Sequence, residues 1–420
     1  MILPDFTPTD SQYGYQTGKG VEFCHGMLND IAHIANSGES PLYICTLDAV
    51  KCFDSIWHDG LFFKLINILS LMKWRYLYNW YKSLKAIVRV NGTESKPFKV
   101  EKGTRQGSII SPHLFNIYID DLLHELKQSP YGVQIMNNVY NSIAYADDIT
   151  LLSLTIPDMQ MLIDICFTYS QKWRFTYGIK KSECLTIGDK NLVKDPVLYL
   201  GKEKIKNVNS IEILGYTYNS SGTSIGHIAN RIQKSRKAMR AIGLQNELLC
   251  PMLKSQLWKS IGVPSLAYSL GTNSITTSEM KLLESTQGTT IKNSLYLNKR
   301  HRHSKLLEAM GIPSIGDIVE KQRTSLPHRV FLANSTYTTL CMSLMAQVMH
   351  NGRTAKGTLL QNIIESGRSP LAIMLGLDSP VITTQPQPDG VRESISNVLQ
   401  NVILPGSHHH TLLKGLTNAF

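Results

Sequence analysis

The sequence lacks several features that would place it in a common class of protein. No stretch approaches the roughly 18 unbroken apolar residues of a membrane span, and the start, Met1 to Phe6, has neither a basic nor an extended apolar segment. The seven cysteines lie far apart and include no Cys-x-x-Cys pair of the kind that holds zinc. We therefore expect a soluble intracellular protein, of the nucleus, the cytoplasm or both, with reduced thiols and no membrane partner.

Acidic residues are scarce in one long segment, which concentrates the positive charge of the chain. The formal net charge is +11, and between Ile225 and Lys305 only Glu247, Glu279 and Glu284 are acidic. The basic residues at the start of this segment are Arg231, Lys234, Arg236, Lys237 and Arg240. Such a segment indicates a polyanionic partner, most simply nucleic acid, and a solvated helical face is the alternative.

The chain is long enough for a large core, and its pattern mixes strands with helices. With 420 residues, 42% of them hydrophobic, it favours two or three domains. Residues 42–47 form a continuous apolar run that predicts a buried strand ending on Asp48. Residues 141–145 and 149–154 predict a hairpin with Ala146, Asp147 and Asp148 at its tip, because aspartate tolerates tight turns.

The remaining elements also alternate between helix and strand. We expect two helices in 56–86, a strand pair around the Asn91-Gly92 turn, a helix capped by Ser111 with Pro112 as its first residue, and a helix over 156–173. Short strands are expected in 183–187, 197–200 and 211–218. This mixed order predicts an α+β fold, and the change to a basic helical pattern places a domain boundary near residues 220–222.

Transfer of a nucleotide to a growing strand needs two Mg²⁺ ions about 4 Å apart, bridged by carboxylates from separate strands. Asp48 at one strand end and Asp147-Asp148 at a hairpin tip meet this need if their strands are neighbours in one sheet. Taken singly, each has an ordinary alternative, because aspartates are common at strand ends, helix caps and hairpin turns.

Four motifs occur in one order that resembles a known family. Residues 47–55 (LDAVKCFDS), 103–116 (GTRQGSIISPHLFN), 145–148 (YADD) and 214–216 (LGY) resemble motifs of the reverse transcriptases of non-LTR (LINE-type) retrotransposons. Residues 12–20 resemble the segment just before the first motif, although Gln16 stands where a basic residue is common. A lone Tyr-x-Asp-Asp would be weak, since Tyr118 to Asp121 is a second match. We assign that copy, inside the expected helix, no catalysis.

The resemblance implies a right-handed polymerase fold. The palm, a mixed or antiparallel sheet with packed helices, would span 41–222, after a remnant of the fingers in 1–40. A helical basic thumb would follow in 223–305, and 306–420 would be a connector of unknown role. Because the match begins too late to include the fingers strands that precede residue 12, we expect a fragment or an N-terminally truncated chain, with weak activity in isolation.

The implied activity is that of an RNA-directed DNA polymerase, which adds deoxynucleotides to a primer 3'-hydroxyl. The substrates would be an RNA template, a DNA primer and deoxynucleoside triphosphates, with two Mg²⁺ ions, or Mn²⁺ as an alternative, and no identifiable protein partner. Asp48 and Asp147 would be direct metal ligands, and Asp148 would assist them. Lys181, within a Gly-Ile-Lys-Lys-Ser motif of unusually short spacing, would act as a general acid near the leaving pyrophosphate.

Other residues would contact the substrates. Phe53 and Ala49 would line the incoming sugar and base, where Phe53 excludes a ribose 2'-hydroxyl, although phenylalanine is also a common core residue. Gln106 and Gly107 would contact the template and nascent base pair, and Arg105 a phosphate or only surface water. Two groups complete the nucleic-acid contacts: the primer-grip residues Leu214, Gly215 and Tyr216, and the backbone-binding residues Arg231, Lys234, Arg236, Lys237 and Arg240.

Two alternatives to an active reverse transcriptase remain. An inactive retrotransposon remnant that only binds nucleic acid predicts the same fold. An intron maturase is disfavoured, because Arg105 precedes Gln106-Gly107 where those enzymes usually carry proline. Residues 383–390 predict a polar, proline-rich break, and His408 to His410 a polar turn, because three consecutive residues cannot face one ion.

Overall fold

The computed structural model describes residues 6–188, 195–222, 225–298, 300–333, 335–351 and 357–365. The predictions for 383–390 and for His408 to His410 lie outside these residues. The chain divides into two compact units, the first from Met1–Cys24 and Ser40–Leu214, the second from His25–Glu39 and Gly215–Phe420. The division thus falls at Leu214/Gly215, ahead of the expected boundary near residue 222, and the predicted assignment of palm, thumb and connector remains a prediction.

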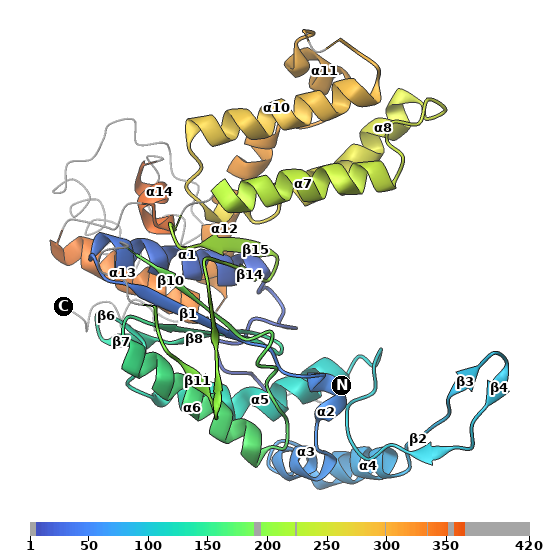
Figure 1. Cartoon of the computed structure of the whole chain (residues 1–420), viewed down its shortest axis with the longest axis vertical. Helices are drawn as coiled ribbons and strands as arrows, with labels where there is room; N and C mark the ends of the chain where they lie inside the picture. The colour runs from blue at the N-terminus through green and yellow to red at the C-terminus, as the bar shows by residue number, and fades with distance from the viewer. Residues whose placement is uncertain are drawn as a thin grey trace, which may run out of the picture. The chain divides into compact units, whose positions relative to one another are not determined.

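The first unit is built on a five-stranded mixed sheet in the order β13-β10-β1-β9-β8 (Figure 1). Its strands are β1 (Leu42–Leu47), β8 (Ser142–Tyr145), β9 (Asp148–Ser153), β10 (Glu183–Ile187) and β13 (Lys206–Val208). The central strand β1 pairs antiparallel with β9 and β10, and β13 adds to β10 in parallel. The run over 42–47 is apolar because β1 lies in the middle of the sheet, as predicted.

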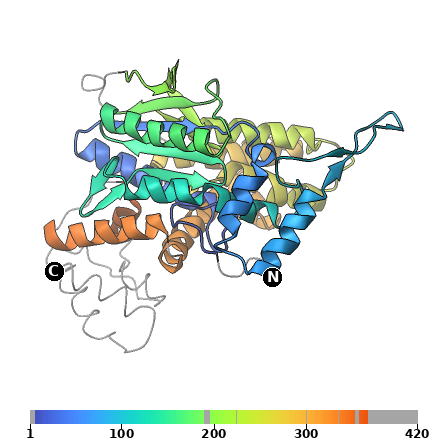
Figure 2. The ribbon, with the colours of Figure 1, turned by 90° about the horizontal axis from the view of Figure 1, so that it is seen from below.

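Two long helices cover one face of this sheet. In Figure 2, α6 (Ile156–Lys172) lies along the strands, and it contacts β9 and β1, while α5 (Ser111–Gln128) contacts β8 and α6. Pro112 stands in the first turn of α5, as predicted. The predicted Ser111 cap is wrong: Ile110 is the cap position, and the Ser111 hydroxyl instead donates to the Arg105 carbonyl at 2.6 Å.

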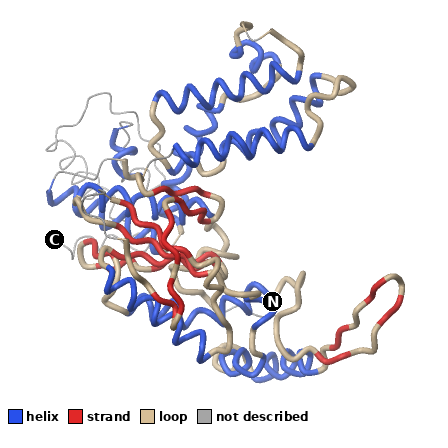
Figure 3. Tube along the Cα trace, viewed as in Figure 1, coloured by secondary structure: helices blue, strands red, loops and turns tan. Residues whose placement is uncertain are grey.

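A helical segment with a projecting ribbon begins inside the first motif, at Cys52. It contains α2 (Cys52–Ser55), α3 (His58–Leu65) and α4 (Leu71–Lys82), and then the strand pairs β2 (Lys85–Ala86) with β5 (Phe98–Lys99) and β3 (Arg89–Val90) with β4 (Thr93–Glu94) (Figure 3). Asn91 and Gly92 have φ of 49° and 81°, which confirms the predicted hairpin turn.

Short strands complete the first unit. They are β6 (Val133–Ile135), β7 (Asn138–Tyr140), β11 (Tyr199–Leu200), β12 (Glu203–Lys204) and β14 (Ser210–Ile213). β6 pairs with β7 and β11 with β12.

The second unit is mostly helical within its described residues. Helix α1 (Val21–Ser37) begins in the first unit and belongs to the second unit from His25 onward. The second unit also contains the strand β15 (Tyr216–Asn219). The other elements are α7 (Ile225–Ala241), α8 (Pro251–Leu257), the π-helix η1 (Trp258–Gly262), α9 (Val263–Ala267), the 3-10 helix η2 (Leu270–Thr272), α10 (Thr277–Ser294), α11 (His303–Ala309), α12 (Ile315–Leu332), α13 (Thr336–Asn351) and α14 (Leu359–Glu365). Residues such as Trp258, Leu266 and Leu283 form its core.

The described chain is therefore an α+β protein, with the sheet in the first unit. No helix among the described residues has both the length and the apolar composition needed to cross a bilayer.

Candidate active site

The sheet brings the predicted carboxylates of two motifs together. Leu47 at the end of β1 pairs with Ile149 of the antiparallel strand β9. Asp48 follows Leu47 and Asp148 precedes Ile149, so the two aspartates face each other across the strands. Asp147 stands in the turn between β8 and β9. The condition on which the sequence prediction depended, that the two strands are neighbours in one sheet, is met.

The turn that carries Asp147 has an unusual backbone at the residue before it. Ala146 adopts a left-handed conformation with φ of 56°, whereas we expected the aspartates to supply the turn geometry. Ala146 is buried, and its N–H donates to the side-chain carbonyl of Gln12 at 2.8 Å. The turn is therefore supported by a residue far away in the sequence.

Asp147 has a thiol as its neighbour. The buried Cys52 of the first motif donates its S–H to Oδ2 of Asp147 at 2.9 Å. Burial, together with this hydrogen bond and the negative charge of Asp147, raises the pKa of the Cys52 thiol well above its usual range. Cys52 therefore stays a neutral hydrogen-bond donor beside the carboxylate.

Lys181 reaches Asp48 from a tight turn over residues 179–181. The Asp48 carbonyl accepts from Gly178 N–H at 2.8 Å, and Lys181 and Ser182 fold back so that both of their N–H groups donate to the Gly178 carbonyl at 3.0 Å. The Lys181 ammonium then lies 3.3 Å from Oδ2 of Asp48, with side chains that are 73% and 32% exposed. An exposed pair of this kind contributes little to stability.

The carboxylates repel one another. The pKa of Asp148 is raised to about 6 by loss of solvation first, then by the charges of Asp147 and Asp48, and Lys181 opposes the shift. A cluster of oxygen donors with excess negative charge has the chemistry that hard divalent cations require. In the residues that the structure describes, no three His, Cys, Asp or Glu side chains are already arranged around one ion position.

The second motif is tied to the first beside this cluster. Thr104 N–H donates to the Phe53 carbonyl at 2.7 Å, and Gly103 N–H to that of Ile56 at 2.8 Å. A Cβ at Gly103, whose φ is 90°, would lie 2.8 Å from the Asp54 carbonyl oxygen, so this approach requires glycine. The two motifs therefore form one structural piece.

The predicted nucleotide-contacting residues lie on this piece. The Phe53 ring packs on Phe115 with centroids 4.7 Å apart and is half-buried, as is Ala49. Gln106 is exposed, and its amide donates to Oδ1 of Asp54 at 2.9 Å, a partner that the sequence prediction did not include. Arg105 is also exposed.

Position 107 favours glycine because of its backbone conformation, not because of close neighbours. Its φ is 79°, and a Cβ there would meet nothing within 4 Å. The open space beside Gly107 is compatible with the predicted close approach of a template strand.

The predicted primer-grip residues form a turn and a buried ring. Leu214 and Gly215, with φ of 49° and 80°, join β14 to β15. Tyr216 is 3% exposed, its ring stacks on His227 with centroids 3.9 Å apart, and its hydroxyl accepts from Asn273. The Tyr216 side chain is therefore packed inside the second unit, and its predicted role in the primer grip stays a prediction.

The predicted basic residues on α7 separate into two kinds. Arg231 is 8% exposed, donates to the Ser265 carbonyl at 2.8 Å and covers the Tyr268 ring. Its guanidinium has internal partners, and its assignment as a backbone-binding residue stays a prediction. Lys234 is half-buried, and the exposed residues are Arg236, Lys237 and Arg240. Arg236 and Arg240 line a cavity of about 240 Å³ together with Thr289, Thr290 and Asn293 of α10.

The second Asp-Asp pair has structural partners. Oδ1 of Asp120 accepts from Thr9 N–H at 2.7 Å, and Asp121 lies 2.9 Å from the buried ammonium of Lys64. Both aspartates thus hold other segments onto α5.

Comparison with known proteins identifies the family. Residues 6–218, more than half of the chain, match the model for "Reverse transcriptase (RNA-dependent DNA polymerase)". The chain belongs to the reverse transcriptase family.

The relatives of this reverse transcriptase chain are retrotransposon proteins. It is 27% identical over 242 residues to a "Retrovirus-related Pol polyprotein from type-2 retrotransposable element R2DM" of Drosophila melanogaster, a match that covers 54% of this chain and 22% of the relative. It is 24% identical over 271 residues to the "RNA-directed DNA polymerase from mobile element jockey" of Drosophila funebris, which covers 62% and 29%. The resemblance to non-LTR retrotransposon polymerases is confirmed, and the chain spans less than a third of either relative.

Solved structures with similarity include an apo telomerase from Candida Tropicalis. That match covers 74% of this chain and 50% of the telomerase, with 10% identity and a TM-score of 0.41.

Sequence reasoning missed several residues of this reverse transcriptase site. Cys52 and Asp54 lie within the first motif, but nothing in the pattern shows that they contact Asp147 and Gln106. Gln12 and Gly14 begin a segment that we recognised, and the only available signal was that both precede the family's first motif.

Proposed function

We propose that this chain is the polymerase part of an RNA-directed DNA polymerase of a non-LTR retrotransposon. It would add deoxynucleotides to a primer 3'-hydroxyl on an RNA template. The observation that supports this most strongly is the placement of Asp48 directly opposite Asp148, with Asp147 in the adjoining turn. Carboxylates from separate strands at one edge of a sheet are the arrangement that nucleotidyl transfer requires.

Asp48 and Asp147 would hold two divalent ions, Mg²⁺ or alternatively Mn²⁺, with help from Asp148. When bound, the ions would lower the pKa of the primer hydroxyl and neutralise the triphosphate. In the chain itself, Asp48 is paired with Lys181 and Asp147 accepts from Cys52. Lys181 is thus within reach of the carboxylates, and its exposed ammonium is available to protonate the leaving pyrophosphate.

The surrounding residues would hold the substrates. Phe53 would lie under the incoming sugar, because its ring is packed against Phe115 and is only half-buried. Gln106, Gly107 and Arg105 would face the template, and the Leu214-Gly215 turn the primer end. Ala49 continues β1 past Asp48 and would approach the same nucleotide.

We also propose that the helical part after residue 222 acts as a thumb that contacts the duplex backbone. The exposed residues Arg236, Lys237 and Arg240 lie within about one turn of α7 and provide three cations. Thr289 on α10 adds a hydroxyl beside Arg236 and Arg240, whereas the Thr290 hydroxyl donates to the Thr286 carbonyl at 2.8 Å. Phosphate binding by cations and hydroxyls is independent of base sequence.

Primer extension on a poly-A RNA template tests the proposal. Because Asp147→Asn removes a charged ligand while keeping side-chain size, we expect it to lower incorporation by more than about 100-fold. Asp121→Asn is the matched control, from the second Tyr-x-Asp-Asp, and should leave incorporation unchanged. The wild-type chain should also prefer deoxynucleotides, as the position of Phe53 requires.

Undiminished incorporation by Asp147→Asn would overturn the catalytic assignment. Wild-type protein that binds an RNA/DNA duplex without any incorporation would instead support the alternative, a remnant that only binds nucleic acid. Equal use of ribonucleotides by the wild-type chain would remove the role of Phe53.

A further inference from the structure

Residues 11–14 run beside the hairpin that carries Asp147, where Gln12 forms an isolated parallel β-bridge with Ala144. Tyr13 N–H donates to the Ala144 carbonyl at 2.8 Å, and Ala144 N–H donates to the Ser11 carbonyl at 3.0 Å. Between these two bonds the side chain of Gln12 is fully buried. Gln12 therefore points to the end of β8, where the turn Ala146-Asp147 begins.

The Gln12 amide binds the peptide groups of Ala146. Its Oε1 accepts from Ala146 N–H and from Gly14 N–H, each at 2.8 Å, and its Nε2 donates to the Ala146 carbonyl at 3.3 Å. One amide thus satisfies a buried N–H and a buried carbonyl on the residue next to Asp147. Each such group, left without a partner, would cost about 1–3 kcal/mol.

Ala146 needs this support because of its conformation. A residue with a Cβ in the left-handed region carries a strain of about 1–3 kcal/mol and stays there only when its surroundings hold it. Ala146 has φ of 56° and is 4% exposed. The Gln12 amide bonds both peptide groups of this buried residue and is therefore placed to hold its conformation.

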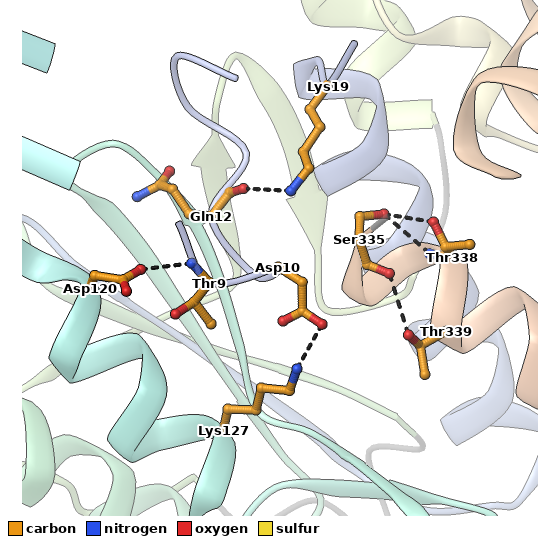
Figure 4. Close-up of polar contacts among 9 residues, drawn as sticks. All are labelled: Thr9, Asp10, Gln12, Lys19, Asp120, Lys127, Ser335, Thr338 and Thr339. Atoms are coloured by element: carbon orange, nitrogen blue, oxygen red, sulfur yellow. Dashed lines mark hydrogen bonds and ion pairs between the residues drawn. The ribbon is translucent and has the colours of Figure 1, made fainter. Parts of the chain in front are cut away.

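The segment that carries Gln12 is itself anchored on helix α5. Figure 4 shows Thr9 bonded to Asp120 and Asp10 paired with Lys127, at 2.7 Å in both cases. In addition, Asn116 donates to the Gly14 carbonyl at 3.1 Å. These three α5 side chains hold residues 9–14 at a fixed place relative to the sheet.

Glycine at position 14 allows the segment 11–14 to lie directly against the Ala146-Asp147 turn. A Cβ at this position would lie 2.3 Å from the Ala146 nitrogen, so any larger residue would push the turn away. Two features of the segment thus bring it against the turn: the amide of Gln12 and the absence of a side chain at Gly14.

We propose that Gln12 is a positioning residue for the reaction: it fixes the Ala146-Asp147 turn and thereby the direction of the Asp147 carboxylate. The proposal rests on the proposed function, because it gives Asp147 the role of a metal ligand. Gln12 itself would touch neither substrate nor metal. Residues that orient metal ligands typically change metal affinity or activity by about 10–100-fold when replaced.

Gln12→Met tests this, because methionine fills a similar volume without hydrogen-bonding to either peptide group. Gln16→Met is the matched control: Gln16 lies in the same segment and donates only to the Gln12 carbonyl, at 3.1 Å. Three properties are measured on the full chain: hydrogen–deuterium exchange of peptides covering residues 143–150, Mn²⁺ affinity by electron paramagnetic resonance, and primer-extension kinetics.

We expect Gln12→Met to speed exchange in residues 143–150 by about 10-fold or more and to weaken Mn²⁺ binding by about 10–100-fold. The kcat should fall by a similar factor while KM for the primer–template duplex stays the same, because the duplex does not contact Gln12. A general loss of structure would change KM as well. Gln16→Met should match the wild type in all three.

If Gln12→Met does not fold, Gly14→Ala replaces it, because it keeps the Gln12 amide and displaces the turn by a Cβ. The same three changes are then expected. A folded Gln12→Met or Gly14→Ala chain with wild-type exchange in residues 143–150 overturns the proposal. This result is independent of the proposed function, which fails instead if Asp147→Asn leaves incorporation and Mn²⁺ binding unchanged.

Discussion

At the scale of single residues, each carboxylate at the sheet edge has a different neighbour. Asp48 pairs with the exposed cation of Lys181, and Asp147 accepts from the neutral thiol of Cys52. Asp148 has lost solvation and lies near the charges of Asp147 and Asp48, and together these raise its pKa to about 6. The carboxylates therefore differ in how readily they bind a cation, although the sequence presents two of them as an identical pair.

Asp30, an acidic residue of the second unit, has a structural role. Asp30 of α1 is 1% exposed, and its carboxylate accepts from Leu359 N–H at 2.8 Å and from the Tyr337 hydroxyl at 3.0 Å. Burial raises the pKa of Asp30 from 3.8 to about 7, although the two hydrogen bonds oppose the shift. Asp30 thus binds α13 and the first residue of α14 at the cost of a buried charge.

This gives a pH dependence of stability. As the pH rises from about 4 to 7, the unfolded chain loses the Asp30 proton before the folded chain does, so folding becomes less favourable across that window. Asp30→Asn keeps the shape without the charge, and should raise the free energy of unfolding at pH 8 by about 1–3 kcal/mol.

Urea unfolding, followed by circular dichroism at pH 8 and at pH 4, measures this effect. Most of the gain should be lost at pH 4, where Asp30 is protonated in the folded chain and roughly half protonated in the unfolded chain. An Asn variant that is less stable than the wild type at pH 8 would show that the charge itself is favourable there.

At the scale of elements, Lys64 joins three helices of the first unit. From α3, its buried ammonium donates to the Tyr118 carbonyl of α5 at 2.7 Å and to the Tyr169 hydroxyl of α6 at 2.6 Å, and it pairs with Asp121. It also lies 3.9 Å from the Trp173 ring centroid. Desolvation lowers the pKa of Lys64, and Asp121 opposes this shift.

We expect Lys64→Met to lower the free energy of unfolding by about 2–4 kcal/mol, because it removes the donor to the buried Tyr169 hydroxyl and the cation paired with Asp121. The Tyr118 carbonyl keeps one donor, the Tyr169 hydroxyl at 2.7 Å. Lys172→Met is the matched control, since Lys172 is exposed and lies farther from the same ring, at 5.7 Å. It should change stability by less than about 0.5 kcal/mol. Thermal unfolding of the two variants checks this, and equal melting temperatures would contradict it.

Elements were predictable where a local pattern decides them. The strand over 42–47, the strand over 183–187 and the Asn91-Gly92 turn appear at the expected residues, because apolar runs and turn residues act locally. The parallel addition of β13 to β10 was not predictable, since nothing in a three-residue strand specifies its partner. Likewise, the Ser111 cap failed because its hydroxyl found a tertiary partner in Arg105.

In the candidate site, too, local motifs were predictable from the sequence, whereas contacts between distant residues were not. Asp48, Asp147 and Asp148 were predictable from motif order, and the sheet register brings them together. The contact of Gln12 with Ala146 was not, because the two residues are 134 positions apart and their meeting depends on the fold. The burial of Arg231 and Tyr216 was hidden for the same reason: the sequence shows charge and ring, but not which neighbours cover them.

At the scale of the whole molecule, the net charge of +11 is the property that most directly concerns a partner. A nucleic acid releases one counterion for each phosphate that a cation neutralises, so binding weakens with salt in proportion to the number of contacts. Among the predicted contacts on α7, only Arg236, Lys237 and Arg240 are exposed. These three are therefore the first of the five predicted contacts to test, since Lys234 is half-buried and Arg231 is buried.

Replacement of these three residues by glutamine should therefore lower the slope of log affinity against log salt by about 2–3 for an RNA/DNA duplex. The control removes the same charge elsewhere: Lys202, Lys204 and Lys206, all exposed in the first unit, are also changed to glutamine. If affinity followed net charge alone, both triple variants would lose the same slope. We expect the control to keep the wild-type slope, because phosphate contacts are local. Fluorescence anisotropy between about 50 and 200 mM salt distinguishes the two outcomes.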